Sequence, residues 1–343
     1  MSSETRPDIS RGAKHLVDNF PCLSTVPDGC VLSREALSEP VAFGSVPVID
    51  VGGLEDPTRR VRTVEEIARA CEEWGFFVAI NHGVDSPLME MMLQLVAKFF
   101  ELPFEEKMIY SSSDEACPVL YGSNLSSDKG MHARHWRDYL RHFGRPFNNN
   151  TCELWPTNPS EYREVTKTYL EEVWKLAMKL AGAISEGLGL DSNYMERVFG
   201  EGSQIVACNY YPKCPQPDLT LGVSAHTDRG GITILMENDV EGLQVRYRGK
   251  WVPVPHVAGS YLVNIGDCVE IMSNGKFKSV EHRAVVNKRR ERIAVAIGNG
   301  PGYDVIVKPI SELISKASKG PSHEPILFKD IRFKEYTTAE MKE

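Results

Sequence analysis

The chain after Gly200 is a succession of short apolar runs rich in β-prone residues, separated by turns of Gly, Pro and Asn. This pattern limits the fold more than any other feature, because many short strands at regular spacing are typical of an antiparallel sandwich or jelly roll. The strands are expected at residues 203–211, 221–226, 232–236, 243–246, 251–254, 261–265, 269–272, 282–286 and 292–297. We therefore expect a core built from two packed sheets.

The chain before Gly200 is dominated by helical periodicity instead. Apolar residues at helical spacing predict three amphipathic helices. These helices are expected at residues 63–74, 88–100 and 161–187. Thr63 and Glu66 form a capping-box pattern at the start of the first helix. Short strands are also expected at residues 46–51, 76–80 and 136–142. The predicted fold class is α+β, with a double-stranded β-helix (jelly-roll) core, flanking helices and a helical N-terminal module.

Four segments follow from this pattern. Residues 1–45 carry Pro, Ser and Gly between short apolar pieces and are expected to form a loosely structured lead-in with one short helix near 12–19. The remaining segments are a helical module at 46–200, the jelly-roll core at 201–310, and a charged C-terminal tail at 311–343 that packs on the core. One short helix is expected near residues 310–316.

Composition excludes several classes of protein. The 343 residues carry a net charge of -8, which argues against binding nucleic acid by phosphate neutralisation. No apolar run has the length of a membrane span, and the N-terminus lacks the apolar region of a secretory signal. The eight cysteines are scattered without C-x-x-C spacing, which is typical of reduced thiols. We expect a cytoplasmic monomer without nucleic-acid or membrane partners.

The segment His226-Thr227-Asp228 is a candidate metal site. Side chains two residues apart on a strand point to the same face, so His226 and Asp228 can reach one ion. Such a pair alone is more often a structural hydrogen bond, but His282 in a later β-run offers a third ligand. Two histidines and one carboxylate leave positions open for a cosubstrate and dioxygen, which is typical of non-haem Fe(II) oxygenases.

A second group of polar residues suits a carboxylate ligand. Arg292 presents a planar fork that stays charged when buried. Asn209 and Tyr211 share one face of their predicted strand, so the Tyr211 hydroxyl is a candidate donor to the same carboxylate and Asn209 a contact at the metal end of the ligand. The alternative interpretation of this strand is structural, with its aromatic residues in the core.

Motifs along nearly the whole chain carry a family resemblance. They lie at residues 70–77, 81–83, 99–103, 209–217, 226–228, 241–244, 249–251, 264–267, 273–275, 282–283 and 292. The chain resembles the plant 2-oxoglutarate/Fe(II)-dependent dioxygenases, the group that includes flavone synthase I, flavonol synthase, anthocyanidin synthase and flavanone hydroxylases. The fold of that family is a distorted jelly roll surrounded by helices, which agrees with the strand pattern.

The resemblance implies cofactors, roles and a reaction. The implied Fe(II) ligands are His226, Asp228 and His282. The residues implied to bind 2-oxoglutarate are Arg292, Tyr211 and Asn209. Oxidative decarboxylation of 2-oxoglutarate to succinate and CO2 would then drive hydroxylation or desaturation of a small molecule by dioxygen, with ascorbate supporting activity. The substrate implied first is a flavonoid, most of all a flavanone.

Two positions depart from the family. Ala294 stands where the family places a Ser in an Arg-x-Ser motif, and the lost hydroxyl removes one hydrogen bond of about 0.5–1.5 kcal/mol. Gly298 stands where flavonoid enzymes commonly place a Phe that stacks on the substrate. We therefore expect weaker cosubstrate binding and a reshaped substrate pocket.

The remaining pocket candidates come from the predicted strands and loops around the metal. They are Tyr139, Arg141, Lys213, Ser224 and Asn299, although Tyr139 also suits a core position and Lys213 a solvated one. The missing Phe keeps open a different substrate, such as a phenolic acid, a hormone or an alkaloid. A catalytically silent ligand-binding module is the alternative from another class.

Overall fold

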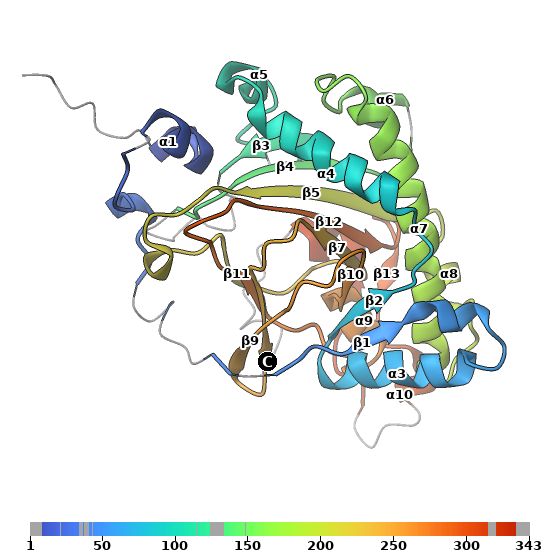
Figure 1. Cartoon of the computed structure of the whole chain (residues 1–343). Helices are drawn as coiled ribbons and strands as arrows, with labels where there is room; N and C mark the ends of the chain where they lie inside the picture. The colour runs from blue at the N-terminus through green and yellow to red at the C-terminus, as the bar shows by residue number, and fades with distance from the viewer. Residues whose placement is uncertain are drawn as a thin grey trace, which may run out of the picture.

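Two β-sheets face each other at the centre of the molecule (Figure 1). The computed structural model describes residues 9–20, 22–33, 37, 41–42, 44–114, 116–123, 134–147, 149–314 and 320–333. The larger sheet has eight strands in the order β1-β2-β10-β7-β12-β5-β4-β3, and the smaller has four in the order β6-β11-β8-β9. The predicted jelly roll with flanking helices is confirmed.

Strands from both parts of the chain build the larger sheet. Its strands are β1 (Val48–Asp50), β2 (Phe76–Ile80), β3 (Val119–Gly122), β4 (Asp138–Phe143), β5 (Ser203–Tyr211), β7 (Ile232–Glu237), β10 (Tyr261–Ile265) and β12 (Arg292–Gly300). The smaller sheet comprises β6 (Val223–His226), β8 (Leu243–Tyr247), β9 (Lys250–Pro253) and β11 (His282–Ala284). A separate pair joins β13 (Ile306–Val307) to β14 (Ile326–Leu327). The larger sheet therefore joins residues on both sides of the predicted boundary at 200–201.

Helices cover the outer face of the larger sheet (Figure 1). The helices are α1 (Ala13–Asn19), α3 (Arg60–Glu73), α4 (Ser86–Glu101), α5 (Phe104–Met108), α6 (Asn149–Glu153), α7 (Tyr162–Gly187), α8 (Tyr194–Phe199), α9 (Asp267–Met272), α10 (Ser311–Ile314) and α11 (Phe328–Phe333). Short 3-10 turns are η1 (Ile9–Arg11), η2 (Asp28–Cys30), η3 (Val51–Glu55) and η5 (Pro217–Leu219). The long helix α7 contacts α3, α4, β7 and β12, so it connects the other helices to the sheet.

Successive side chains along β12 point to opposite faces of the larger sheet. Ile293, Val295 and Ile297 belong to the core beneath the helices. The intervening Ala296 and Gly298 are only partly buried and face the smaller sheet. The inner face of β12 therefore carries small residues after Arg292.

One predicted strand is a helix. Residues 269–272 were expected in β-structure, but they form the second half of α9 (Asp267–Met272). A short apolar run does not distinguish a strand from a buried helix. Asp267 and Glu270 lie in the first turn of α9, where acidic side chains favour a helix.

The predicted cap of α3 is also wrong. This helix begins at Arg60, one turn before Thr63. The Thr63 hydroxyl donates to the carbonyl of Arg59 instead of accepting from a free N–H at the helix start. The other long helices lie within a few residues of their predicted bounds.

The described part of the N-terminal lead-in is not loose. Leu16, Val26 and Cys30 are buried in one cluster with Tyr211 and Ala294. These contacts place Leu16, Val26 and Cys30 against the end of the jelly roll that holds the first residues of β12. The prediction of a loosely structured segment therefore does not hold for residues 9–20 and 22–33.

The C-terminal segment closes the other part of the core. Phe328 and Ile331 of α11 are buried in the main cluster. Residues 334–343 lie outside the described residues. Among the helices that the structure describes, none combines the length and apolar character needed to cross a lipid bilayer.

Candidate metal centre and cosubstrate site

The smaller sheet brings together the three predicted metal ligands. His226 ends β6 and pairs in register with His282, which begins β11. Asp228 follows two residues after His226, and its Oδ1 lies 3.8 Å from His226 Nε2 and 3.6 Å from His282 Nε2. The three donor atoms lie within 4.8 Å of one another, so one ion between them can bind all three.

Hydrogen bonds orient each of these side chains toward a common centre. His226 Nδ1 donates to the Ser224 carbonyl at 2.9 Å, and His282 Nδ1 donates to the Val280 carbonyl at 3.2 Å. Both imidazoles therefore keep the Nε2 lone pair for a metal. Asp228 Oδ2 accepts from Asn264 Nδ2 at 2.8 Å, which leaves Oδ1 facing the histidines.

The electrostatics of the site favour a cation. Desolvation and the neighbouring His282 lower the pKa of His226 to about 4. Burial alone would raise the pKa of Asp228, but His282, His226 and the Asn264 amide hold that pKa at about 2. At neutral pH the site therefore offers the neutral imidazole of His226 and the carboxylate of Asp228, with His282 Nε2 beside them. This donor set fits Fe(II) and leaves coordination positions for other ligands.

Arg292 lies at the start of β12, opposite Tyr211 of β5. Its side chain is 2% exposed, and its guanidinium lies 5.0 Å from the centre of the Tyr211 ring. Burial by itself would lower the pKa of Arg292, but Glu237 and Tyr211 raise it above the usual value. A Cβ on Gly242 would lie 2.7 Å from Arg292 Cδ, so Gly242 makes room for this side chain.

Sequence reasoning missed the ion pair that Arg292 makes. Glu237 Oε2 accepts from Arg292 Nε at 2.8 Å and from Arg292 Nη2 at 2.5 Å. Glu237 ends β7 on the same face as Thr233 and Leu235. The alternation of side chains along the strand therefore predicts that Glu237 points to the inner face of the sheet. The cross-strand partner could not be read from one strand alone.

Asn209 meets a second arginine that sequence reasoning also missed. Asn209 Oδ1 accepts from Arg137 Nη1 at 3.0 Å, and its Nδ2 donates to the Ala207 carbonyl at 3.3 Å. Arg137 alternates with Tyr139 and Arg141, so the pattern that singled out those two residues also pointed to Arg137. The amide oxygen of Asn209 therefore holds a buried cation.

Three of the predicted pocket residues lie on the inner side of the jelly roll. Tyr139 pairs in register with Asn209, and Arg141 pairs with Ala207. Arg141 Nη2 also donates to the Cys117 carbonyl at 3.0 Å. Ser224 precedes His226 on β6, and its hydroxyl lies 2.7 Å from His135 Nε2.

The other two predicted pocket residues lie elsewhere. Asn299 is fully buried on the helix side of β12. There its Oδ1 accepts a hydrogen bond from Gln204 Nε2, and its Nδ2 donates to the carbonyls of Ile232 and Ile297. It has the same parity along the strand as Ile297, which is why it points away from the metal. The Lys213 side chain is 56% exposed and lies 3.9 Å from Glu291, so it is a surface residue.

Comparison with known proteins places the chain in a family. A family model of the 2OG-Fe(II) oxygenase superfamily matches residues 202–300, and a model of the non-haem dioxygenase in morphine synthesis N-terminal region matches residues 46–158. Jasmonate-induced oxygenase 4 of Arabidopsis thaliana is 42% identical over 295 residues, covering 85% of this chain and 80% of that protein. The chain belongs to the 2OG-Fe(II) oxygenase superfamily.

Other members of this superfamily show the same relationship. Flavanone 3-dioxygenase 2 of Oryza sativa subsp. japonica is 39% identical over 304 residues, covering 88% of this chain and 85% of that protein. A crystal structure of JOX2 in complex with 2OG, Fe and JA has a TM-score of 0.83 and 35% sequence identity, covering 94% of this chain and 92% of that one. The predictions of a 2-oxoglutarate- and Fe(II)-dependent dioxygenase, and of those two cofactors, are confirmed.

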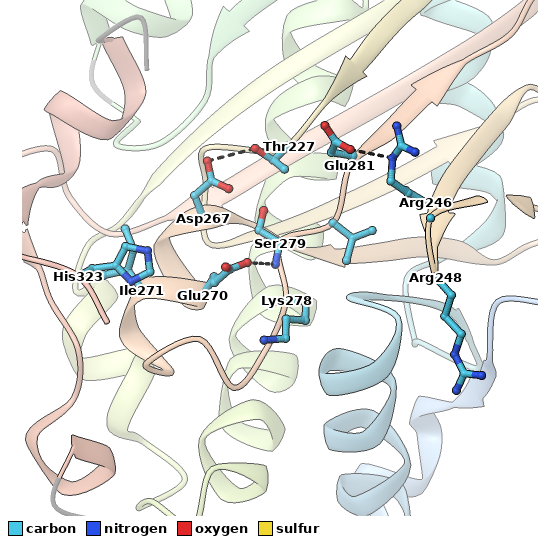
Figure 2. A pocket seen from close by; sticks show the side chains of 12 residues that line it. Thr227, Arg246, Arg248, Asp267, Glu270, Ile271, Lys278, Ser279, Glu281 and His323 are labelled. Carbon is cyan, nitrogen blue, oxygen red and sulfur yellow. Dashed lines mark hydrogen bonds and ion pairs between the residues drawn. The ribbon is translucent and has the colours of Figure 1, made fainter. Parts of the chain in front are cut away.

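A separate hollow of about 420 Å³ lies behind the metal-binding segment of this 2OG-Fe(II) oxygenase (Figure 2). Thr227 lines it, whereas His226 and Asp228 do not. Its lining carries three basic and three acidic side chains, Arg246, Arg248, Lys278, Asp267, Glu270 and Glu281, and Arg246 pairs with Glu281 at 2.8 Å. The hollow is therefore a charge-balanced surface feature on the opposite side of the strand from the metal ligands.

Proposed function

We propose that this oxygenase oxidises a C–H bond of a small metabolite that carries a carboxylate. The observation that carries the proposal is Arg137, a buried cation that has no anionic partner among the described residues. Its side chain is 4% exposed, and it makes no ion pair with a carboxylate in the described part of the chain. A buried charge without a counter-ion is unfavourable by several kcal/mol, so a ligand that brings the missing charge is expected to bind there.

The surroundings of Arg137 support a substrate site near the metal. Its guanidinium lies 5.2 Å from the centre of the Tyr139 ring, and its positive charge contributes to the lowered pKa of His226. The Nε atom of Arg137 is buried without a hydrogen-bond partner among the described residues. An acid that packs on Tyr139 could accept this N–H while its hydrocarbon part extends toward the metal.

The inner face of the larger sheet offers space for such a molecule. Arg141 pairs in register with Ala207, and Ala207 pairs with Ala296 on the next strand. One row further, Ile205 pairs with Gly298. The small side chains of Ala207, Ala296 and Gly298 favour space for a ligand on this face, and Arg141 supplies a second positive charge beside them.

The reaction divides between the bound groups and the chain. Bound Fe(II), with 2-oxoglutarate and dioxygen, supplies the oxidising power that breaks the C–H bond, with release of succinate and CO2. In the proposed site His226, Asp228 and His282 hold the metal through Nε2 and Oδ1. Arg292 and Tyr211 hold the far carboxylate of 2-oxoglutarate. The protein then acts by positioning the reacting bond and excluding water.

Matched acids and esters test the proposed substrate class. The Fe(II)-loaded chain is incubated with 2-oxoglutarate, ascorbate, and cinnamic, indole-3-acetic or jasmonic acid or the methyl ester of each. We expect at least one acid to yield succinate together with a product that has gained oxygen or lost hydrogen, and its ester to react about tenfold or more slowly. Faster turnover of the esters, or of neutral substrates alone, would contradict the proposal.

A flavanone is the second candidate. It is favoured by the buried Tyr139 on the inner face and by the similarity to flavanone 3-dioxygenase 2. Incubation with naringenin under the same conditions tests it through the mass of the product. Coupled turnover of naringenin that exceeds that of every acid would make the flavanone the preferred substrate class.

A further inference from the structure

We infer that Glu237 is an internal competitor of 2-oxoglutarate for Arg292 and thereby sets the affinity for the cosubstrate. This inference rests on the proposed role of Arg292 as the site of the far carboxylate. Glu237 is a positioning residue in this scheme, because it acts on the cosubstrate through Arg292.

Glu237 occupies one edge of the Arg292 guanidinium. Arg292 Nε and Nη2 both donate to Glu237 Oε2, at 2.8 and 2.5 Å. Nε and Nη2 form the edge of the guanidinium that can give two parallel bonds to a carboxylate. Arg292 Nη1 is buried and has no hydrogen-bond partner among the residues that the structure describes. An incoming carboxylate therefore finds only the N–H groups of Nη1 and the remaining N–H of Nη2, on a guanidinium whose charge Glu237 already balances.

Burial makes this competition strong. The side chains of Arg292 and Glu237 are 2% and 12% exposed. Solvent and salt screen charges poorly in such surroundings. A cosubstrate carboxylate that enters beside Glu237 is attracted by one positive charge and repelled by one negative charge. The net electrostatic attraction is then much smaller than an unpaired Arg292 would give.

Ala294 acts in the same direction. It pairs in register with Glu237 on the neighbouring strand, so the two side chains lie side by side on the inner face. The methyl group of Ala294 offers no hydroxyl to a ligand and no hydrogen bond to hold Glu237 elsewhere. The cosubstrate end of the cavity thus lacks one neutral donor and contains one additional carboxylate.

The test measures binding of 2-oxoglutarate to the full chain, with Mn(II) in place of Fe(II) so that no turnover occurs. Glu237→Gln removes the charge and keeps the size of the side chain. We expect calorimetry to give a Kd about tenfold lower for Glu237→Gln than for the unmodified chain. Glu291→Gln is the matched control, because Glu291 is about half exposed and should leave Kd unchanged. An unchanged or higher Kd for Glu237→Gln would overturn the inference.

A second measurement needs no folded variant of Glu237. The unmodified chain is titrated with 2-oxoglutarate and with 2-oxopentanoate, which has a methyl group in place of the far carboxylate. If Glu237 neutralises Arg292, the far carboxylate should improve Kd by about tenfold or less. An improvement on the order of 1,000-fold, as expected for an unopposed buried arginine, would contradict the inference.

Arg292→Gln separates this inference from the proposed function. If Arg292→Gln leaves the Kd for 2-oxoglutarate unchanged, the proposed role of Arg292 fails and the inference fails with it. If Arg292→Gln weakens binding strongly while Glu237→Gln has no effect, the role of Arg292 stands and only the competition by Glu237 is rejected.

Discussion

Two arginines are buried on the inner face of the larger sheet, and they differ in their counter-ions. Arg292 is 2% exposed and donates two N–H groups to Glu237. Arg137 is 4% exposed and donates to the neutral amide oxygen of Asn209. Within the described part of the chain, the first cation has a carboxylate of its own and the second does not.

This difference indicates that the two arginines bind different ligands. A buried pair stabilises the protein before any ligand binds, but the partner carboxylate weakens the attraction for an incoming anion. A buried cation without a partner has the opposite effect, since it destabilises the empty protein and favours an anionic ligand. We therefore assign the cosubstrate to Arg292, with reduced affinity, and the substrate anion to Arg137.

The largest expected effect comes from Arg292 itself. Arg292→Gln should raise the Kd for 2-oxoglutarate by about 100- to 1,000-fold, because the far carboxylate loses its cation and Glu237 remains buried without a partner. Calorimetry with Mn(II) measures this change. The exposed Arg290→Gln, on the neighbouring surface turn, is the control and should bind as the unmodified chain does. A shift below about fivefold would break the assignment of Arg292 to the cosubstrate.

The acidic residue next to Arg137 in sequence does not pair with that arginine. Asp138 points to the other face of β4, where it accepts from the Tyr121 hydroxyl at 2.9 Å and from the Ala13 N–H at 2.8 Å. Burial raises the pKa of Asp138 to about 6, although these hydrogen bonds oppose the shift. Its carboxylate therefore anchors α1 and is not available to Arg137.

This raised pKa predicts a pH-dependent stability. Because the folded-state pKa lies above the unfolded value of about 4, the contribution of Asp138 is fully favourable below pH ~4 and is lost as pH rises through about 6. The free energy of unfolding of the unmodified chain, minus that of Asp138→Asn, should fall by about 3 kcal/mol between pH ~4 and ~7. Urea titrations measure it. Glu90→Gln on an exposed helix position should show no such trend, and a difference that rises with pH would contradict the prediction.

Removal of the charge of Arg137 should change the preference for an acid substrate and leave the affinity for 2-oxoglutarate unchanged. Arg137→Gln should reduce the preference for an acid over its methyl ester by about 10- to 30-fold, and leave the Kd for 2-oxoglutarate within about twofold. Arg141→Gln is the matched control on the same strand. If Arg141→Gln removes the preference and Arg137→Gln does not, the substrate anion belongs at Arg141.

The smallest change is the return of a hydroxyl at position 294. Ala294→Ser should lower the KM for 2-oxoglutarate by about 2- to 10-fold, equivalent to one hydrogen bond of about 0.5–1.5 kcal/mol. Steady-state succinate formation at varied 2-oxoglutarate measures this effect. An unchanged or higher KM would show that Glu237 alone limits cosubstrate binding at this end of the cavity.

Much of the fold and the metal site could be predicted, because both are encoded over short stretches. The spacing of His226 and Asp228 on a strand, the long apolar stripe of α7, and the short β-runs each depend on local alternation or periodicity. The odd or even position of a residue along a strand also tells which face its side chain occupies, and the prediction of the pocket residues did not use it. Asn299 has the opposite parity to Arg292 along β12, so it could have been excluded from the pocket.

The counter-ions could not be predicted in the same way. Glu237 meets Arg292 because β7 pairs with β12 in one particular register, and the two residues are far apart in sequence. Within the described residues Arg137 has no carboxylate partner, because the neighbouring Asp138 lies on the opposite face and binds α1. Residues 269–272 became a helix because a run of that length is compatible with either structure. Each of these outcomes depends on contacts between distant segments.

The division of labour between the two arginines is tested most directly by measuring both ligands on both variants. The Kd for 2-oxoglutarate and the preference for acid over ester are determined for the unmodified chain, Arg137→Gln and Arg292→Gln. We predict that Arg292→Gln weakens 2-oxoglutarate binding, and that Arg137→Gln lowers only the preference for the acid. A loss of 2-oxoglutarate affinity in Arg137→Gln as large as that in Arg292→Gln would contradict the assignment.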